Sequence, residues 1–318
     1  MDTFSHVLIA FLLLGQFDLN LGVFAGIMAL ILDLDVILYP LTKRYPHFDH
    51  RGIVHSVPGV ICVTVVASLI FSLITGIGYW LSLGAGLIGA FSHVTCDNLT
   101  NYGTLTFWPF VKKYVKLDII PGISPLTIIV STISIPFLYS SYQDLNALLF
   151  NNIYLAASVF FGIYFLSRIL LKSYIRLKFP NMNSIPGFNP IKYKLVQNSQ
   201  YQEGNQEYKE LRWRTINLIT GKSTEEEHFL YALMNPTPPL DTDEKMISFS
   251  YNTQYIQRIL AHSNFHICEI VEKSEGTVVI FWYALELSAG KWRMGAAISL
   301  KRDGTYETKR IYPYPPRH

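Results

Sequence analysis

Long stretches without charge constrain the fold of this chain more than any other feature. A helix needs about 20 mostly apolar residues to cross the hydrocarbon layer of a bilayer. Five segments reach that length, two of them interrupted by a pair of polar residues: 21–41, 56–79, 81–100, 123–142 and 147–167. With the shorter apolar segment 4–17, the chain predicts six membrane helices. A signal peptide is the alternative for segment 4–17, although Asp2 is the only early charge and the expected basic n-region is missing.

Composition separates two parts of the chain. Residues 1–180 contain ten Lys/Arg, eight Asp and no Glu, whereas residues 181–318 contain sixteen Lys/Arg and fifteen Asp/Glu. Overall, 50% of the residues are hydrophobic and 15% are charged, which suits a partly membrane-embedded protein. The predicted fold is a mostly helical, six-helix integral membrane bundle (1–178) followed by a small soluble α+β domain (179–318).

Charge and cysteine content exclude some functions. The net charge is only +3, without a basic cluster or an aromatic stacking motif, so no nucleic-acid partner is expected. Cys62, Cys96 and Cys268 lie far apart and lack metal-type spacing. A disulfide framework is therefore not expected.

The basic residues predict the orientation in the membrane. With six helices, every basic connection falls on one side: Lys43, Arg44 and Arg51 in the first, Lys112, Lys113 and Lys116 in the second, and Lys172, Arg176 and Lys178 at the exit. The other side receives no Lys or Arg. By the positive-inside rule, both termini are cytoplasmic, which predicts a multi-pass protein of the cytoplasmic (inner) membrane.

Seven ionisable residues lie at the same predicted depth, near the cytoplasmic face: His6, Asp33, Asp35, His50, His55, His93 and Asp97. Ionisable groups at membrane depth are costly and usually find partners inside a bundle. His93 and Asp97 are four residues apart and share one helix face. Asp33 and Asp35 would diverge by roughly 200° on a regular helix. One of the two could bind a metal while the other orients a histidine.

The combination of imidazole and carboxylate favours zinc, manganese or iron over magnesium. One or two zinc-like ions in such a site would lower the pKa of bound water and polarise a substrate oxygen. Asp35 or Asp97 would then serve as a general base, and Arg51 would hold an anion. Ser56 has a simpler interpretation as the cap of the following helix. His47 is interpreted as an interfacial or hydrogen-bonded residue, and Asp49 as part of a solvated loop.

Three other interpretations stay open at this point. The polar residues could form a buried network that joins helices. They could form an ion or proton pathway, although the opposite leaflet is nearly free of polar groups. The metal could also be structural, in a membrane anchor whose soluble domain binds a regulator or another protein partner.

Four motifs in order give the chain a family resemblance. They are SHVLIA with His6, LDLD with Asp33 and Asp35, HRGIVHS with His50, Arg51 and His55, and SHVTCDNLTNYGTLTFWP with His93 and Asp97. The pattern over residues 1–170 resembles the YdjM-type family of inner-membrane proteins, which are predicted metal-dependent hydrolases. Leu32 and Asn101 replace prolines that are usual in the family. The resemblance implies a metal-binding helical membrane domain, distantly similar to zinc-dependent phospholipase C and P1-type nucleases. It also implies a phosphoester substrate, such as a lipid head group in the membrane.

The tail has its own patterns. The segment PNMNSIPGFNP reads as a linker, and the alternation in GTVVIFWYALELSAGKWRMGAAISLKRDGTY predicts an antiparallel meander. A helix is expected around 252–262. His228, His262 and His266 lack a clear acidic partner, so they carry no metal prediction.

Overall fold

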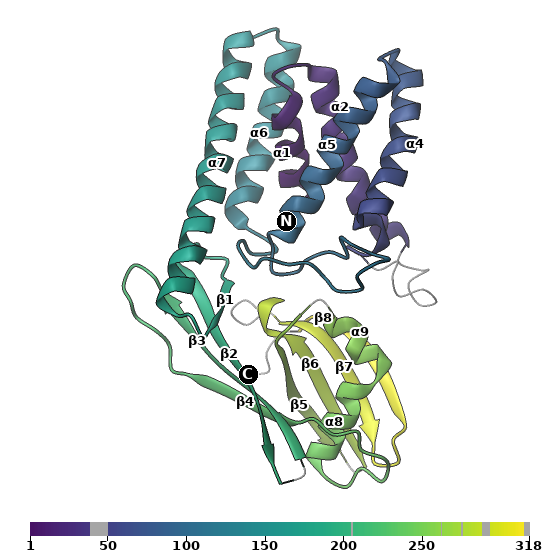
Figure 1. The fold of residues 1–318 in the computed structure, drawn as a ribbon, viewed down its shortest axis with the longest axis vertical. Coiled ribbons are helices and arrows are strands. Elements are labelled where there is room, and N and C mark those ends of the chain that lie inside the picture. The colour runs from purple at the N-terminus through teal and green to yellow at the C-terminus, as the bar shows by residue number, and fades with distance from the viewer. Residues whose placement is uncertain (39–49, 205, 262, 275, 288–292, 315–318) are drawn as a thin grey trace. The chain divides into compact units, whose positions relative to one another are not determined.

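The computed structural model describes residues 1–38, 50–204, 206–261, 263–274, 276–287 and 293–314 (Figure 1). Lys43, Arg44, His47, Asp49 and His262 lie outside these ranges. The chain forms two compact units, Met1–Leu171 and Lys172–His318. The described residues contain eight α-helices and two four-stranded antiparallel sheets.

Each of the six apolar segments contains a helix in the structure. The helices are α1 (Thr3–Leu14), α2 (Leu19–Asp33), α4 (Val57–Thr75), α5 (Tyr79–Asn98), α6 (Pro125–Gln143) and α7 (Ala147–Lys178). Of the described helices, α4, α6 and α7 are long and apolar enough to cross a membrane. α1 and α2 are shorter, and α5 has 20 residues but is less apolar. The structure thus supports three candidate spans by length and composition, fewer than the six predicted.

Two helix ends differ most from their predicted positions. α2 ends at Asp33, and residues Leu34–Leu38 form the 3-10 helix η1, so the segment is not one regular helix up to residue 41. α7 continues to Lys178, 11 residues beyond the predicted end at 167. Its last turn contains the basic residues Arg176 and Lys178. Water solvates these side chains, and their positive charge interacts favourably with the C-terminal end of the helix dipole.

Side-chain caps explain where several helices begin. Asp2 Oδ1 accepts a hydrogen bond from Ser5 N (2.9 Å), and Asp18 Oδ1 accepts one from Leu21 N (3.0 Å). Ser56 Oγ accepts from Gly59 N at 3.2 Å, which confirms the predicted cap of α4. These contacts satisfy backbone donors that have no partner inside the helix.

Large apolar side chains cover the outer faces of the candidate spans. Leu73 and Ile74 on α4 are 77% and 78% exposed, and Leu155 and Ile163 on α7 are 63% and 64% exposed. Faces of this kind need lipid rather than water around them. Small residues allow close contact between other helices of the unit: a Cβ at Gly89 of α5 would lie 2.2 Å from Ala25 O of α2. This close approach is typical of helix packing in membranes.

The second unit is built from two antiparallel meanders. One sheet contains β1 (Asn183–Pro186), β2 (Lys192–Glu203), β3 (Gln206–Asn217) and β4 (Glu227–Ala232); the other contains β5 (His266–Ser274), β6 (Thr277–Ala284), β7 (Arg293–Lys301) and β8 (Tyr306–Tyr314). The β6–β8 part confirms the predicted meander. β1 lies inside the segment that was interpreted as a linker. That interpretation was therefore wrong for Asn183–Pro186. Those residues instead pair with β2 in register Asn183 to Val196.

Alternating residues of β6 divide the core of this unit. Ile280 and Trp282 pack with Met246 of α8 (Asp243–Asn252) and Ile256 of α9 (Gln254–Leu260). Phe281 and Tyr283 pack on the other face, against residues of β2 and β3 that include Val196, Leu211 and Trp213. The sheet is thus buried on both sides (Figure 1). The helix expected around 252–262 is confirmed as α9, and Thr253, which has extended backbone, separates it from the preceding helix α8.

Candidate metal centre

The structure brings all seven predicted residues together in the first unit. His6 is on α1, Asp33 ends α2, Asp35 is in η1, His50 precedes and His55 ends the 3-10 helix η3 (Ile53–His55), and His93 and Asp97 are on α5. Two groups of three could each hold a metal ion: His6, His93 and Asp97, and Asp33, His50 and His55. Within each group the ligand atoms lie within 4.8 Å of one another.

Four atoms from three elements face one another across the boundary of these two groups. His55 Nε2 lies 3.2 Å from His93 Nε2. His93 Nε2 is 3.5 Å from both Asp33 Oδ1 and Asp97 Oδ2, and His55 Nε2 is 3.8 Å from Asp97 Oδ2. Ligand atoms about 2.1 Å from a tetrahedrally bound zinc are about 3.4 Å apart. The observed separations therefore have the size of the edges of a four-ligand site.

His6 completes the buried side of the site. Its ring stacks on His93, with centroids 3.8 Å apart and an interplanar angle of 22°, and its Nε2 lies 3.1 Å from Asp97 Oδ1. The Nδ1 atoms of His6, His55 and His93 are buried and have no hydrogen-bond partner among the described residues; the same holds for Asp97 Oδ2. Buried polar atoms without partners are costly. A bound cation would satisfy Asp97 Oδ2.

Asp35 contacts the Nδ1 atoms of two histidines and not the Nε2 and carboxylate oxygen atoms that face one another. Its Oδ1 lies 2.7 Å from His50 Nδ1, and its Oδ2 lies 3.1 Å from His55 Nδ1, the latter without hydrogen-bond geometry. Arg51 N also donates to Asp35 Oδ2 at 3.1 Å. A carboxylate on Nδ1 fixes a ring so that Nε2 points toward a metal. The two neighbouring aspartates thus have different surroundings because the backbone changes from α-helix to 3-10 helix between them.

Arg51 is buried beside Asp97. Its Nη2 lies 2.8 Å from Asp97 Oδ1, its Nη1 donates to Thr100 Oγ1 at 3.1 Å, and its guanidinium covers the ring of Tyr102 at 4.9 Å. The backbone of Arg51 has φ 65°, which a residue with a Cβ adopts at a cost. The Met1 amino nitrogen also contacts Asp97 Oδ1, at 2.6 Å. Oδ1 is thus occupied by donors, whereas Oδ2 faces the imidazoles.

The site is fully buried on one side and partly exposed on the other. The side chains of His6, His55, His93 and Asp97 have no exposure, whereas those of His50 and Asp33 are 39% and 14% exposed. Access from outside therefore reaches the Asp33–His50 edge first.

Two contributors were missed by the sequence predictions. Thr3 Oγ1 donates to Asp33 Oδ2 at 2.6 Å, which fixes the carboxylate from α1. Its only signal is its position three residues before His6, on the same helix face. Tyr102 lies within the fourth motif, but its contact with Arg51 depends on the loop path. That path is fixed by Asn98, whose Oδ1 accepts from Thr104 Oγ1 (2.8 Å) and Thr106 Oγ1 (3.1 Å).

A comparison with protein families covers this unit. Residues 1–169, more than half of the chain, match the family model of the YdjM inner membrane protein. The chain belongs to the YdjM inner membrane protein family. Together with its apolar helices, this membership identifies a membrane protein. The two positions where this YdjM chain departs from the resemblance, Leu32 and Asn101, are both buried and outside the ligand groups.

One curated relative of this YdjM-family chain is the uncharacterized protein YfhP of Bacillus subtilis (strain 168). It is 28% identical over 151 residues, which are 47% of this chain and 44% of YfhP. The match thus spans less than half of that relative's length. No solved structure matches the chain.

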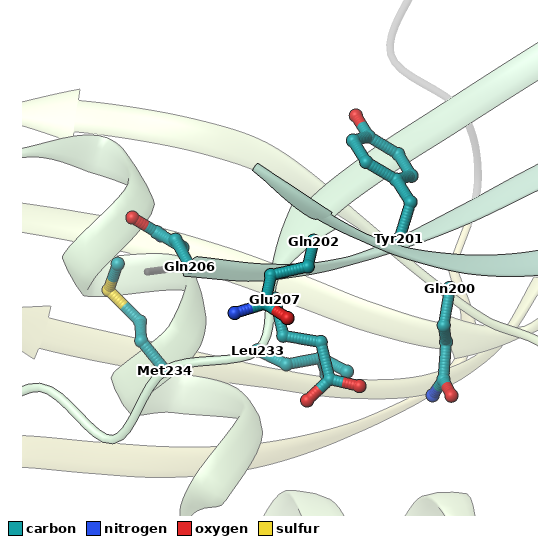
Figure 2. Close-up of a pocket in the computed structure, with 7 residues that line it drawn as sticks. All are labelled: Gln200, Tyr201, Gln202, Gln206, Glu207, Leu233 and Met234. Atoms are coloured by element: carbon teal, nitrogen blue, oxygen red, sulfur yellow. The ribbon is translucent and has the colours of Figure 1, made fainter. Parts of the chain in front are cut away.

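The second unit of this YdjM-family chain contains a pocket of about 640 Å³ at the β2–β3 hairpin (Figure 2). Its lining is mostly amide and apolar: Gln200, Tyr201, Gln202, Gln206, Glu207, Leu233 and Met234. Glu207 is the only carboxylate in that lining. The pocket therefore lacks the ligand density of the His/Asp cluster, which remains the candidate site.

Proposed function

We propose that the protein is a multi-pass membrane metallohydrolase of the cytoplasmic membrane that acts on a phosphoester or lipid-type substrate, with both termini in the cytoplasm. The observation that carries the proposal is the position of His93 Nε2, which lies 3.2 Å from His55 Nε2 and 3.5 Å from both Asp33 Oδ1 and Asp97 Oδ2, with Asp97 Oδ2 also 3.8 Å from His55 Nε2. Four buried or half-buried ligand atoms at these separations fit a divalent cation better than a set of mutual hydrogen bonds, because two imidazole Nε2 atoms can share only one proton between them.

The residues present fit zinc or manganese. Asp33, His55, His93 and Asp97 would hold a first ion. A second ion could be bound on one side with His6 as a nitrogen ligand, or on the other side with His50. Such ions, when bound, supply Lewis-acid activation of water and of a phosphoryl oxygen. The mixed nitrogen and oxygen donors are typical of zinc, and manganese accepts the same ligands.

The surrounding residues have positioning roles in this proposal. Asp35 holds the rings of His50 and His55, so we assign it to orientation rather than to proton transfer. Asp97 keeps Oδ1 on Arg51 and offers Oδ2 to the site, either as ligand or as proton acceptor. Arg51 Nε is buried and has no hydrogen-bond partner among the described residues, so the guanidinium retains a donor for a phosphate oxygen.

The partial exposure of His50 and Asp33 favours a reactive site over a structural one. A structural metal is closed off by protein ligands, whereas a catalytic one keeps an accessible position. The exposed edge gives a substrate a path to the cluster. Membrane lipids are the substrates nearest to such an edge, and the C-terminal unit could recruit a protein partner.

The proposal is tested by assaying the detergent-purified full chain, loaded with zinc or manganese, on soluble phosphomonoesters, phosphodiesters and phospholipids. We expect metal-dependent turnover of one class. His93→Ala should abolish it, whereas His228→Ala, which removes an exposed histidine of β4, should not. Equal turnover in wild type and His93→Ala would contradict the proposal, as would inactivity of metal-loaded wild type on all three classes.

A further inference from the structure

The connection between α5 and α6 contains a turn with exposed apolar side chains. Phe107 is 51%, Val111 43% and Phe110 88% exposed. Lys112 and Lys113 follow directly, and both are exposed. Exposing these apolar side chains to water is unfavourable, and an exposed apolar patch of this kind marks a site of contact with a membrane or another molecule.

Backbone hydrogen bonds hold this turn in one shape. Thr104 and Val115 exchange both backbone hydrogen bonds, at 3.1 and 2.8 Å, and close the base of the protrusion. Val111 N donates to Phe107 O at 3.0 Å, which folds its tip. Leu105 N donates to Arg51 O at 3.1 Å and thereby fastens the base to the candidate metal centre. The exposure of Phe107 and Phe110 is therefore a property of an ordered turn.

The turn lies at the level where candidate spans begin. Thr106 O accepts a hydrogen bond from Val57 N (2.9 Å), and Val57 is the first residue of α4. The same connection leads into α6, which begins at Pro125. Figure 1 shows the connection running across one end of the helices of this unit. α4 and α6 are apolar enough to cross a membrane, and spans that begin at these residues would place the turn at the membrane surface.

The charge of the connection is complementary to an anionic surface. Residues 99–117 include Lys112, Lys113 and Lys116 and contain no Asp or Glu. The turn between α6 and α7 is different: Leu145 is 88% exposed, yet its neighbour is Asp144 and no Lys or Arg is near it in sequence. The combination of exposed aromatics and lysines thus distinguishes the α5–α6 end.

We infer that residues 105–113, the interfacial turn, insert Phe107 and Phe110 into the membrane interface and bind anionic phospholipid headgroups through Lys112 and Lys113. The apolar rings then enter the headgroup and acyl boundary, while the ammonium groups stay among the phosphates. Because its base is bonded to Arg51, the turn keeps anionic headgroups beside the candidate metal centre. The inference rests on membrane location and on the exposed residues of the turn, and not on a bound metal or on hydrolysis.

The test uses full-length protein in nanodiscs of mixed phosphatidylcholine and phosphatidylglycerol. A fluorophore is attached at Phe110→Cys in a Cys62→Ser background, since Cys96 and Cys268 are buried. Quenching is measured with headgroup spin-labelled phosphatidylglycerol, with spin-labelled phosphatidylcholine and with aqueous iodide. Leu145→Cys, at a residue with the same exposed fraction of 88%, is the control position.

We expect the probe at residue 110 to be quenched by both lipids, and more strongly by phosphatidylglycerol. Each lysine should contribute a preference on the order of five-fold. Lys112→Gln/Lys113→Gln should remove the preference, whereas Lys222→Gln/Lys301→Gln, an equal charge change in the second unit, should leave it intact. The probe at residue 145 should show no preference for the anionic lipid.

Three outcomes would overturn the inference. Quenching by iodide but not by lipid would mean that the turn is in water. Protection from lipid and iodide alike would mean that protein covers it. Retention of the phosphatidylglycerol preference in Lys112→Gln/Lys113→Gln would contradict the assignment of headgroup binding to these lysines.

Discussion

His55 and His93 face each other through their Nε2 atoms, 3.2 Å apart, although 38 residues separate them in the chain. His55 ends a 3-10 helix that leads into α4, and His93 lies on α5. Each ring has its Nδ1 atom directed away from the other ring. This relationship makes the pair the centre of the candidate metal site.

Asp35 is predicted to support metal affinity without being a ligand. In Asp35→Ala, His50 and His55 would lose the carboxylate on their Nδ1 atoms. Loss of such an orienting carboxylate costs about 10-fold to 100-fold in affinity. Asp35→Asn should lose less, because its side-chain oxygen can still accept a hydrogen bond. Competition with a chelator of known affinity measures the change; an unaltered affinity in Asp35→Ala would refute the assigned role.

Arg51 is predicted to stabilise the site through Asp97 and Thr100. In Arg51→Ala, the buried Asp97 loses its guanidinium partner, and removal of one partner of a buried ion pair costs about 3–5 kcal/mol. Arg51→Lys should be intermediate, because an ammonium group cannot span both contacts as a planar guanidinium does. The apparent melting temperature in detergent should be highest for wild type, lower for Arg51→Lys and lowest for Arg51→Ala. Identical melting of all three proteins would be incompatible with this account.

Gly89 is predicted to set the approach of α2 to α5. A Cβ there would lie 2.2 Å from Ala25 O, so Gly89→Ala must push the backbones apart, at about 1–3 kcal/mol. Gly84, also on α5, has no neighbouring atom within 4 Å of an added Cβ. Gly84→Ala should therefore be neutral, or more stable by up to about 1 kcal/mol. Thermal unfolding of both variants in detergent decides the point: equal melting temperatures would show that the helices do not pack as described.

His266 is predicted to make the second unit sensitive to acid. Burial lowers the pKa of His266, whose Nδ1 lies 3.1 Å from Tyr251 Oη and whose Nε2 lies near two backbone carbonyls. The folded unit thus prefers the neutral ring, whereas the unfolded chain protonates near pH 6.5. The contribution of the neutral His266 ring to the free energy of unfolding is therefore fully present above pH 6.5. It is lost as the pH falls from 6.5 toward the lowered pKa of the folded state.

Urea unfolding of the full chain, followed by tryptophan fluorescence at a series of pH values, measures this dependence. His266→Gln should show a weaker loss of stability between pH 7 and pH 5 than wild type. The control is His228→Gln, because His228 is exposed on β4. A wild-type profile that matches His266→Gln would rule out His266 as the source.

The sequence predicted helix positions well because uncharged runs of 20 residues have few alternatives to a helix in lipid. It predicted the ends of α2 and α7 poorly, since the change to a 3-10 helix after Asp33 and the solvated basic turns up to Lys178 leave the apolar pattern only weakly altered. The β2–β3 hairpin was missed because its outer half, near Gln202 and Gln206, is polar on both faces.

The candidate ligands could be chosen from sequence because ionisable residues are unexpected in apolar helices. The direction in which each side chain points around its helix could not be predicted from sequence. The stacking of His6 on His93 and the separate surroundings of Asp33 and Asp35 depend on packing between α1, α2 and α5. Spacing along one helix carries no information on contacts of this kind.

Metal content is the most direct test of the central claim that these residues form a metal site. Mass spectrometry on detergent-purified wild type, His55→Ala, His93→Ala and the exposed control His228→Ala, each incubated with zinc and manganese, gives the metal per chain. The account predicts one or two ions per chain in wild type and in His228→Ala, with loss of at least one ion in both His55→Ala and His93→Ala. Wild-type protein without stoichiometric metal after this incubation would contradict it and would favour a buried polar network.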